Sequence, residues 1–368
     1  MKLLIRRADG SWAEPEITGH KSEDDLQELL ATSPDLLPGS ETGLPMAVAR
    51  ELRVATGQID VVGVDVEGEL TLCECKLAAN PGARREVVGQ LLEYAGALRG
   101  MTFEDLSSRF EARAGRPMAA SVSHIAGEGF DEESFEGQVA ENLRAGRFRL
   151  VIVVDRITEA LKQTVTYLND HLDSSILALE LAYLRDGEVE MLVPAVYGEE
   201  VAERKERDRN PPVADADTVV VAARIAYQEY LETGSYVCQA GRRFRDDIEY
   251  LGFYKDKAIQ PEVPVIRHRR DSVTFSRDKA SSLRASGDES DAIIAGLIDE
   301  NLDSGRRAEG DSHQVFLLSS PGDEMTLVLP QEIPHAKKGA WTQGQRYTSS
   351  EALRRGAATT EELQAEGG

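Results

Sequence analysis

The chain has 368 residues, of which 41% are hydrophobic, and its formal net charge is −23 at pH 7. This length and apolar content suffice for two domains with real cores, and no window approaches the roughly 20 apolar residues of a membrane span. Such an acidic chain is not suited to coat nucleic acid by electrostatics alone, because neutralising phosphates requires clustered Lys and Arg. We expect a cytoplasmic protein that does not engage a membrane.

The cysteines and histidines do not indicate a zinc site. Cys73 and Cys75 lie two apart in a strand-like run, and Cys238 is far away in the chain. The six histidines are scattered, without paired spacing near a cysteine. We therefore expect reduced cysteines in the core.

The first predicted element is a short amphipathic helix over 22–31, with Ser22 as N-cap and Leu26, Leu29 and Leu30 as its apolar side. Strand-like runs follow, and the apolar spacing after them is that of a helix. The predicted order is therefore α-β-β-β-α. These strands cover 44–55, 57–66 and 68–77, and the helix covers 83–99.

Further elements can extend the same sheet. A looser segment over about 112–130 precedes a predicted helix near 132–145. Next come a buried strand, a second helix, and a hairpin that turns at Asp186-Gly187. Their predicted ranges are 147–155, 158–172, 176–184 and 189–197.

Residues 199–217 are charged, contain Pro211-Pro212 and lack periodic apolar positions, which is typical of a linker. We therefore predict one domain over 1–198 and a second, of α+β class and unassigned fold, over 218–368. In the second domain we expect helices at 218–231 and 289–302, and strands at 272–276, 314–319 and 325–329.

A predicted hairpin brings three charged residues together. A three-residue loop, Val66 to Gly68, would pair Asp65 with Glu69, and continued pairing sets Asp60 opposite Glu74. Alternation along the strand puts Lys76 on the same face. Solvent-facing charges are the ordinary explanation for such a pattern, but here both faces of the hairpin are otherwise apolar. Buried paired carboxylates are costly unless they bind something, and a divalent cation is the usual ligand.

This pattern resembles the PD-(D/E)XK nuclease superfamily. The run Gly57-Gln58-Ile59-Asp60, and then Glu74-Cys75-Lys76, match its signature, and the surroundings look like the NucS-type, RecB-like endonuclease domain. The resemblance covers about 20–195. Further agreeing positions are Ser22-Glu23, Leu26, Ser33-Pro34, Arg50-Glu51, Gln90 and Tyr94. It implies a restriction-endonuclease-like αβββαβ core with a mixed central sheet.

Roles follow from the resemblance and from what phosphodiester hydrolysis requires. Asp60, Glu74, the carbonyl of Cys75 and Glu23 would hold Mg²⁺ or Mn²⁺, and Lys76 would serve the water or the phosphate. Gln90 and Tyr94, one helical turn apart, would orient the site; helix packing is the alternative explanation for both.

Arginines are the candidates for contacts with nucleic acid. Residues 242–284 contain eleven Lys or Arg against seven Asp or Glu, interleaved with aromatic side chains. The alternative explanation of this segment is an ordinary β-rich fold with exposed arginines. The candidate contacts are Arg50, Arg84, Arg85, Arg267, Arg269 and Arg270.

We thus expect a Mg²⁺- or Mn²⁺-dependent DNA endonuclease, a hydrolase in DNA repair or in defence against foreign DNA. RNA remains open as a substrate, and a homodimer is compatible with the sequence. The alternative is a nucleic-acid-binding sensor or adaptor, in which the C-terminal domain recognises a ligand or partner and controls the nuclease fold.

Overall fold

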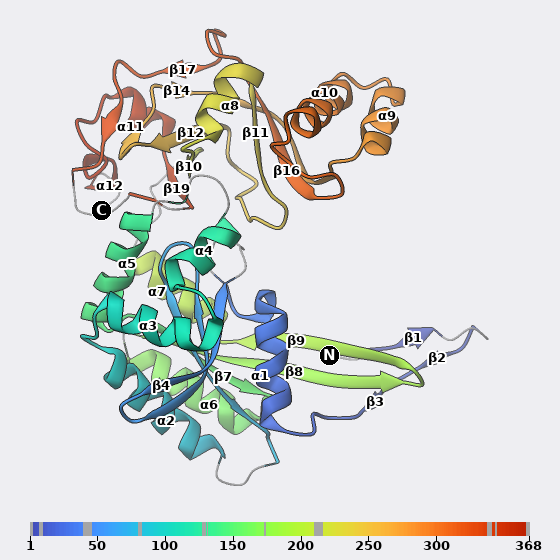
Figure 1. The fold of residues 1–368 in the computed structure, drawn as a ribbon, viewed down its shortest axis with the longest axis vertical. Coiled ribbons are helices and arrows are strands. Elements are labelled where there is room, and N and C mark those ends of the chain that lie inside the picture. The colour runs from blue at the N-terminus through green and yellow to red at the C-terminus, as the bar shows by residue number, and fades with distance from the viewer. Residues whose placement is uncertain are drawn as a thin grey trace. The chain divides into compact units, whose positions relative to one another are not determined.

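The computed structural model describes residues 3–6, 10–39, 46–79, 83–126, 130, 132–172, 174–209, 216–336, 341–342 and 344–365. The chain forms two compact units. Unit 1 comprises residues 1–40, 45–125 and 136–210, and unit 2 comprises 41–44, 126–135 and 211–368. Both mix helices with sheets, so the chain is of the mixed α/β class (Figure 1).

Unit 1 is built on one mixed sheet in the order β3-β8-β7-β6-β5-β4, with β9 paired to β8. Strands β4, β5 and β6 are antiparallel neighbours, whereas β6, β7 and β8 run parallel. The strands of unit 1 are β1 (Ile5–Arg6), β2 (Trp12–Ala13), β3 (Glu16–Ile17), β4 (Ala47–Val54), β5 (Gly57–Val64), β6 (Leu70–Lys76), β7 (Phe148–Val154), β8 (Ser175–Asp186) and β9 (Val189–Tyr197). Figure 1 shows the β8–β9 hairpin extending past α1.

Helices accompany this sheet, and the predicted α-β-β-β-α order is confirmed. They are α1 (Glu23–Thr32), the 3-10 helix η1 (Pro34–Leu36), α2 (Ala83–Leu98), α3 (Phe103–Ala114), α4 (Met118–Ala126), α5 (Glu132–Ala145), α6 (Glu159–His171) and α7 (Glu199–Arg209). Ser22 caps α1 by accepting from the Asp25 N–H, and the Asp25 carboxylate accepts from the Ser22 N–H.

The β5–β6 hairpin has the predicted register. Val61 pairs with Cys73 and Val64 with Leu70, as a three-residue loop requires. Gly68 lies at φ +74°, and a Cβ there would come within 3.1 Å of Val139 in α5. Glycine is needed both for the left-handed turn and for this close approach.

Both faces of this hairpin are buried, as the apolar sequence predicted. Val61, Cys73 and Cys75 belong to a core cluster with Leu26 and Leu30 of α1. On alternate positions, Val62, Leu70 and Leu72 are equally inaccessible. Helix α2 contacts β6 and β7, and α6 contacts β8. A charged side chain in the middle of this sheet is therefore removed from water.

Two sequence predictions for unit 1 are wrong. The looser segment over 112–130 contains the end of α3 and all of α4, because Thr102 and Gly115 cap α3 and Met118, Ala119 and Val122 of α4 are buried. The predicted linker begins with α7, where the Lys205 ammonium donates to the carbonyls of Leu172 (2.7 Å) and Ser174 (3.0 Å). These contacts, together with the partly buried Ala202, attach the charged helix to unit 1.

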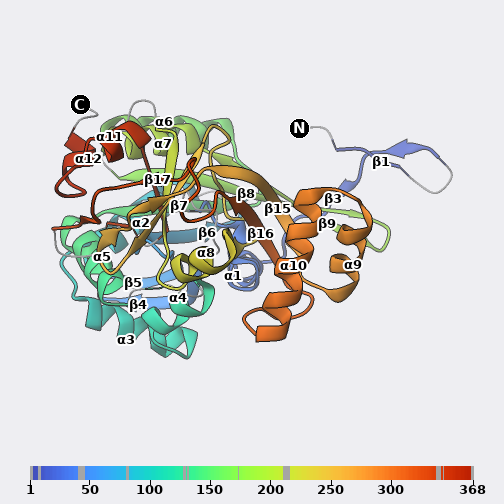
Figure 2. The ribbon, with the colours of Figure 1, turned by 90° about the horizontal axis from the view of Figure 1, so that it is seen from above.

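Unit 2 contains a five-stranded sheet in the order β18-β13-β12-β10-β19, a three-stranded sheet β11-β16-β15, and the pair β14-β17. Figures 1 and 2 show α9 and α10 side by side next to β15 and β16, where they cover a core that includes Val273 and Phe275. The strands are β10 (Thr218–Ala222), β11 (Ser235–Gln239), β12 (Tyr250–Lys255), β13 (Ala258–Ile259), β14 (Glu262–Val263), β15 (Ile266–Thr274), β16 (Ser312–Leu318), β17 (Leu327–Val328), β18 (Ile333–Pro334) and β19 (Gln345–Thr348). The helices are α8 (Ala226–Thr233), α9 (Arg277–Ala285), α10 (Glu289–Ser304), α11 (Ser350–Arg354) and α12 (Glu362–Ala365).

The helix predicted over 218–231 is wrong in its first half. Residues 218–222 form β10, an interior strand between β12 and β19, and α8 begins only at Ala226. The run Val219-Val220-Val221 is fully buried, and β-branched side chains suit such a pleated, enclosed position. In the described part of both units, no helix is long and apolar enough to cross a membrane.

Asp65 is a buried carboxyl group in the turn of the β5–β6 hairpin. One oxygen accepts the N–H groups of Glu67 and Glu69, each at 3.0 Å, and the other is buried without a hydrogen-bond partner among the described residues. Burial and the nearby charge of Glu69 raise the pKa of Asp65 to about 8.

We predict that Asp65→Asn stabilises the protein increasingly as the pH rises above about 5. Because the folded-state pKa lies above the unfolded value, the folded protein keeps a proton between about pH 4 and pH 8 that the unfolded chain has already released, and stability declines as the pH rises through that range. An amide accepts the same two N–H groups without carrying charge. The variant should melt at least a few degrees above wild type at about pH 9, and close to it at about pH 5. The exposed Asp170→Asn is the control, and an equal difference at both pH values would contradict the prediction.

Candidate active site

The pairing of β5 and β6 ends next to Asp60. The Asp65 N–H donates to the Glu69 carbonyl (3.2 Å), which makes Asp65 and Glu69 a hydrogen-bonded pair. Hydrogen-bonded pairs alternate along an antiparallel ladder, so Val61 and Cys73 form another such pair. If the ladder continued, the following hydrogen-bonded pair would be Ile59 and Cys75. The Cys75 N–H instead donates to the Asp60 carboxylate at 2.8 Å. In an extended strand the N–H and C=O of one residue point to the same side, so the Cys75 carbonyl also faces the Asp60 side.

Glu74 and Lys76 follow on the same face of β6. The Lys76 ammonium lies 2.9 Å from Glu74 Oε1 and 3.4 Å from Glu23 Oε2. Glu23, in the first turn of α1, also accepts the Leu77 N–H at 3.4 Å. Four predicted site residues, Asp60, Glu74, Lys76 and Glu23, therefore come together, from two strands and one helix.

Burial sets the electrostatics of this group. Glu74 is only 1% exposed, and burial together with the charge of Asp60 raises its pKa to about 7. Burial also raises the pKa of Asp60, against the opposing effects of the Cys75 N–H and Lys76. Burial alone would lower the pKa of Lys76, but the hydrogen bond and charge of Glu74 outweigh it and hold that pKa above its usual value. One cation thus compensates several carboxylates.

Tyr94 of α2 lies near the carboxylates, and Gln90 of the same helix hydrogen bonds to it. Burial raises the pKa of Tyr94, and the charges of Glu74 and Asp60 add to that rise, whereas a hydrogen bond from Gln90 opposes it. The Tyr94 ring also packs over Gly57, where a Cβ would come within 3.4 Å of the ring. Tyr94 therefore both packs α2 on β5 and places its hydroxyl near the site.

Two buried oxygens of the site lack a donor. Glu74 Oε2 and Gln90 Oε1 are both buried without a hydrogen-bond partner among the described residues. Unpaired buried acceptors are expensive, and a divalent cation with its water ligands would satisfy them. The donor set of Asp60, Glu74 and the Cys75 carbonyl consists of oxygens, which suits Mg²⁺ or Mn²⁺. Against this, the described side chains include no group of three or more His, Cys, Asp and Glu arranged to hold a metal ion.

Glu51 is a residue of the site region that its sequence pattern did not single out for a role. It lies in β4 at φ +53°, a left-handed conformation that is costly for a residue with a side chain. The described register of β4 on β5 passes from Arg50–Val61 to Leu52–Ile59 without a Glu51–Asp60 pair. Asp60 therefore sits where the ladder is interrupted towards both β4 and β6.

Helix α3 holds β4 in this conformation. The Arg113 Nε donates to the Arg50 carbonyl (3.1 Å), and its guanidinium also forms an ion pair with Glu51. Four residues earlier, Arg109 donates to the Arg53 carbonyl (3.0 Å). Figure 1 shows α3 beside β4, the last strand of the sheet order. These arginines satisfy edge-strand carbonyls on either side of Glu51, a tertiary contact that no local sequence signal announces.

The predicted nucleic-acid contacts of unit 1 either pair with acidic side chains or lie outside the described side chains. Arg50 forms ion pairs with Asp24 and Glu28 of α1, and donates to Gln27 at 3.3 Å. It therefore attaches α1 to β4. Arg84 and Arg85 belong to the first turn of α2, and their side chains lie outside the described residues.

In unit 2 the predicted arginines all have acidic partners. Arg267 pairs with Asp323, Arg270 with Asp291, and Arg269 with Asp271 at 2.7 Å. The arginines of helix α9 are neutralised in the same way: Arg277 and Arg284 both pair with Asp299. The acids at 291, 299 and 323 lie outside the basic segment, so they neutralise charges that the local sequence left unbalanced.

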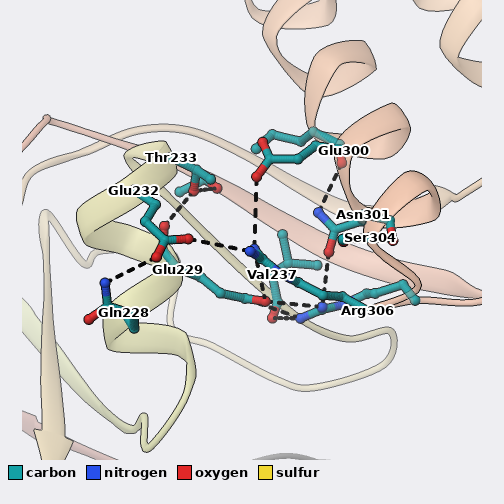
Figure 3. A network of polar contacts seen from close by, with 12 residues as sticks. Gln228, Glu229, Glu232, Thr233, Val237, Glu300, Asn301, Ser304 and Arg306 are labelled. Carbon is teal, nitrogen blue, oxygen red and sulfur yellow. Dashed lines mark hydrogen bonds and ion pairs between the residues drawn. The ribbon is translucent and has the colours of Figure 1, made fainter.

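A further ion-pair network joins α8 to the end of α10. Arg306 lies 3.3 Å from Glu232 and 3.8 Å from both Glu229 and Glu300, as Figure 3 shows. Arg307 reaches Glu229 at 3.4 Å and donates to the Val237 carbonyl at 3.2 Å. The arginines of this network connect elements within unit 2 and are not available as a separate basic surface.

We predict that Glu51→Gly melts higher than Glu51→Ala. Both variants lose the Arg113 ion pair, but only glycine adopts the left-handed conformation without the cost of about 1 to 2 kcal/mol that a Cβ brings. At Gln58 of β5 the order should reverse, because glycine is the poorer residue in an ordinary strand. Thermal unfolding of the four variants in EDTA tests this, and an alanine variant at 51 that equals or exceeds the glycine variant would refute it.

Comparisons with known proteins do not identify the function of this site. Comparison with protein-family models, with curated proteins and with solved structures finds no match to the chain. What the site does must therefore follow from its own residues and from their geometry.

Proposed function

We propose that unit 1 is a Mg²⁺- or Mn²⁺-dependent DNA endonuclease with a restriction-endonuclease-like core. The observation that carries this is the convergence of Asp60, Glu74 and Lys76 where β5 and β6 stop pairing, with Glu74 Oε2 buried and unpartnered. The order α1-β4-β5-β6-α2, with β7 parallel to β6, also supports such a core.

The protein's residues would divide the work of hydrolysis. Asp60, Glu74 and the Cys75 carbonyl would hold the cation, with Glu23 at the edge of the set. The bound cation would polarise the phosphate and lower the pKa of the attacking water. The Cys75 N–H fixes the Asp60 carboxylate, so this ligand is oriented before any ion arrives.

Lys76 has the position to serve the reacting phosphate. Its ammonium stays charged because Glu74 and Glu23 surround it, and its pKa is raised. A fixed positive charge in a water-poor site stabilises the charge that develops on the phosphate oxygens. Tyr94 and Gln90 would position the carboxylates from the α2 side.

The second candidate is a nucleic-acid-binding sensor or adaptor controlled by unit 2. The observation in its favour is that the described side chains contain no ready-made group of three or more metal ligands. Such a protein would bind DNA or RNA without cutting it, and cleavage assays separate the two proposals.

We predict metal-dependent cleavage that depends on the three central residues. Purified protein should cut plasmid or linear DNA with Mg²⁺ or Mn²⁺ and not with EDTA. Asp60→Asn and Glu74→Gln remove the negative charge that binds the cation, and Lys76→Met removes the charge that serves the phosphate. Each should reduce the rate at least about a hundredfold. RNA substrates run in parallel decide between the two nucleic acids.

Asp65→Asn is the matched control, because it neutralises a buried carboxyl of the same hairpin outside the site, and it should cleave at the wild-type rate. In EDTA, Asp60→Asn and Glu74→Gln should melt no lower than wild type, since they relieve repulsion between carboxylates. Cleavage that persists in both carboxylate variants would refute the assignment. Binding of nucleic acid without any cleavage would favour the sensor.

A further inference from the structure

Four exposed arginines lie on the β4 side of the candidate site. They are Arg53 at the end of β4, Arg109 and Arg113 of α3, and Arg116 just after α3. We call them the α3 arginine row. The row is not part of the basic segment that the sequence indicated, and it lies in unit 1, which also contains Asp60 and Glu74.

The row is connected to the site through Glu51. Arg113 forms an ion pair with Glu51, and the Arg50–Val61 and Leu52–Ile59 pairs that flank Glu51 on β4 also flank Asp60 on β5, although Glu51 and Asp60 are not themselves paired. Neighbouring strands lie about 4.8 Å apart, so the row begins one strand away from a proposed metal ligand. A chain of phosphates that crosses the site towards β4 would reach these arginines next.

The positive charge of the row is only partly neutralised. Arg53 and Arg116 have no side-chain partner among the described residues, and Arg109 contacts only the Arg53 carbonyl. At 100° per residue, Glu104 and Glu111 lie on the opposite flank of α3 from Arg109 and Arg113. Asp105, one turn before Arg109, is the acid of α3 on the arginine side. The row therefore keeps a local positive excess in a chain of net charge −23.

The guanidinium groups are also held ready for a ligand. Arg113 uses Nε and Nη2, and Arg109 uses Nη1, for the contacts with β4. Among the described residues this leaves Arg113 Nη1 and Arg109 Nε and Nη2 without an acceptor. Arginines fixed in this way lose little freedom when they bind a phosphate, for which their planar donor set is suited. In unit 2, by contrast, Arg267, Arg269 and Arg270 already have acidic partners.

We infer that the α3 arginine row binds the phosphodiester backbone of the nucleic acid on which the site acts, beside the cleaved position. This inference rests on the proposed function for the identity of the ligand. It replaces the basic segment of unit 2 as the surface that lets an acidic chain hold a polyanion, because attraction must come from a local surface when the net charge opposes it.

Binding is to be measured in EDTA, where no cleavage occurs, by fluorescence anisotropy with labelled single-stranded and duplex oligonucleotides at several salt concentrations. The test variant is Arg53→Gln/Arg116→Gln, which removes two charges without touching a described side-chain contact. Its control is Arg224→Gln/Arg243→Gln, which removes two exposed arginines of unit 2 that likewise lack a described side-chain partner. A second variant, Arg109→Gln/Arg113→Gln, is read together with its melting temperature.

The test variant should bind about tenfold more weakly, and the slope of log affinity against log salt should fall by roughly 0.7 per lost contact on single strands and 0.9 on duplex. The control should lose less than about twofold. Equal losses in test and control, unchanged binding in the test variant, or no binding by wild type would each overturn the inference. The inference would also be overturned if poly-glutamate competed for binding as well as an oligonucleotide of equal charge, because the ligand of the row would then be an acidic peptide. Row-dependent binding without cleavage in Mg²⁺ would overturn the proposed function alone.

Discussion

The constraint on which unit 1 depends is the burial of carboxylates inside a sheet that is covered on both faces. Glu74 is 1% exposed, and its neighbours along β6 are equally enclosed. Ionised groups in such surroundings lose hydration that one ammonium, that of Lys76, restores only in part. The raised pKa of Glu74 and its unpartnered oxygen are two expressions of this imbalance. A bound cation would resolve it, so the charge balance and the proposed chemistry lead to the same residues.

The sheet makes room for this group by giving up regular pairing around Asp60. Towards β6 the ladder ends at Cys73, and the Asp60 carboxylate replaces a backbone carbonyl as the acceptor for Cys75. Towards β4 the interruption requires Glu51 in a left-handed conformation, which costs stability wherever a Cβ is present. Arg113 stabilises that conformation through Glu51 and the backbone. Backbone strain, an ion pair and the proposed site thus form one local unit.

Unit 2 deals with its charges differently. There the cations are met by carboxylates from other elements, as Arg270 is by Asp291 and Arg306 by Glu232. Ion pairs of this kind contribute modestly to stability, but several joined together fix how helices and strands pack. The arginines of unit 2 are paired with carboxylates, whereas those on α3 are incompletely paired. An anionic ligand would therefore gain more electrostatic stabilisation at α3 than at the arginines of unit 2.

The sequence by itself determined the αβββα order, the β5–β6 register and the convergence of Asp60, Glu74 and Lys76. Turn chemistry at Gly68 and strand alternation are local rules, so a short stretch of chain contains them. It did not determine that residues 218–222 form an interior strand, where tertiary burial decided between helix and strand. Only the tertiary structure showed which arginines are neutralised and that Glu51 adopts its unusual conformation. Those features depend on partners far away in the chain, such as Asp323 for Arg267 and Arg113 for Glu51. Charges that lie dozens of residues apart meet only once the chain has folded.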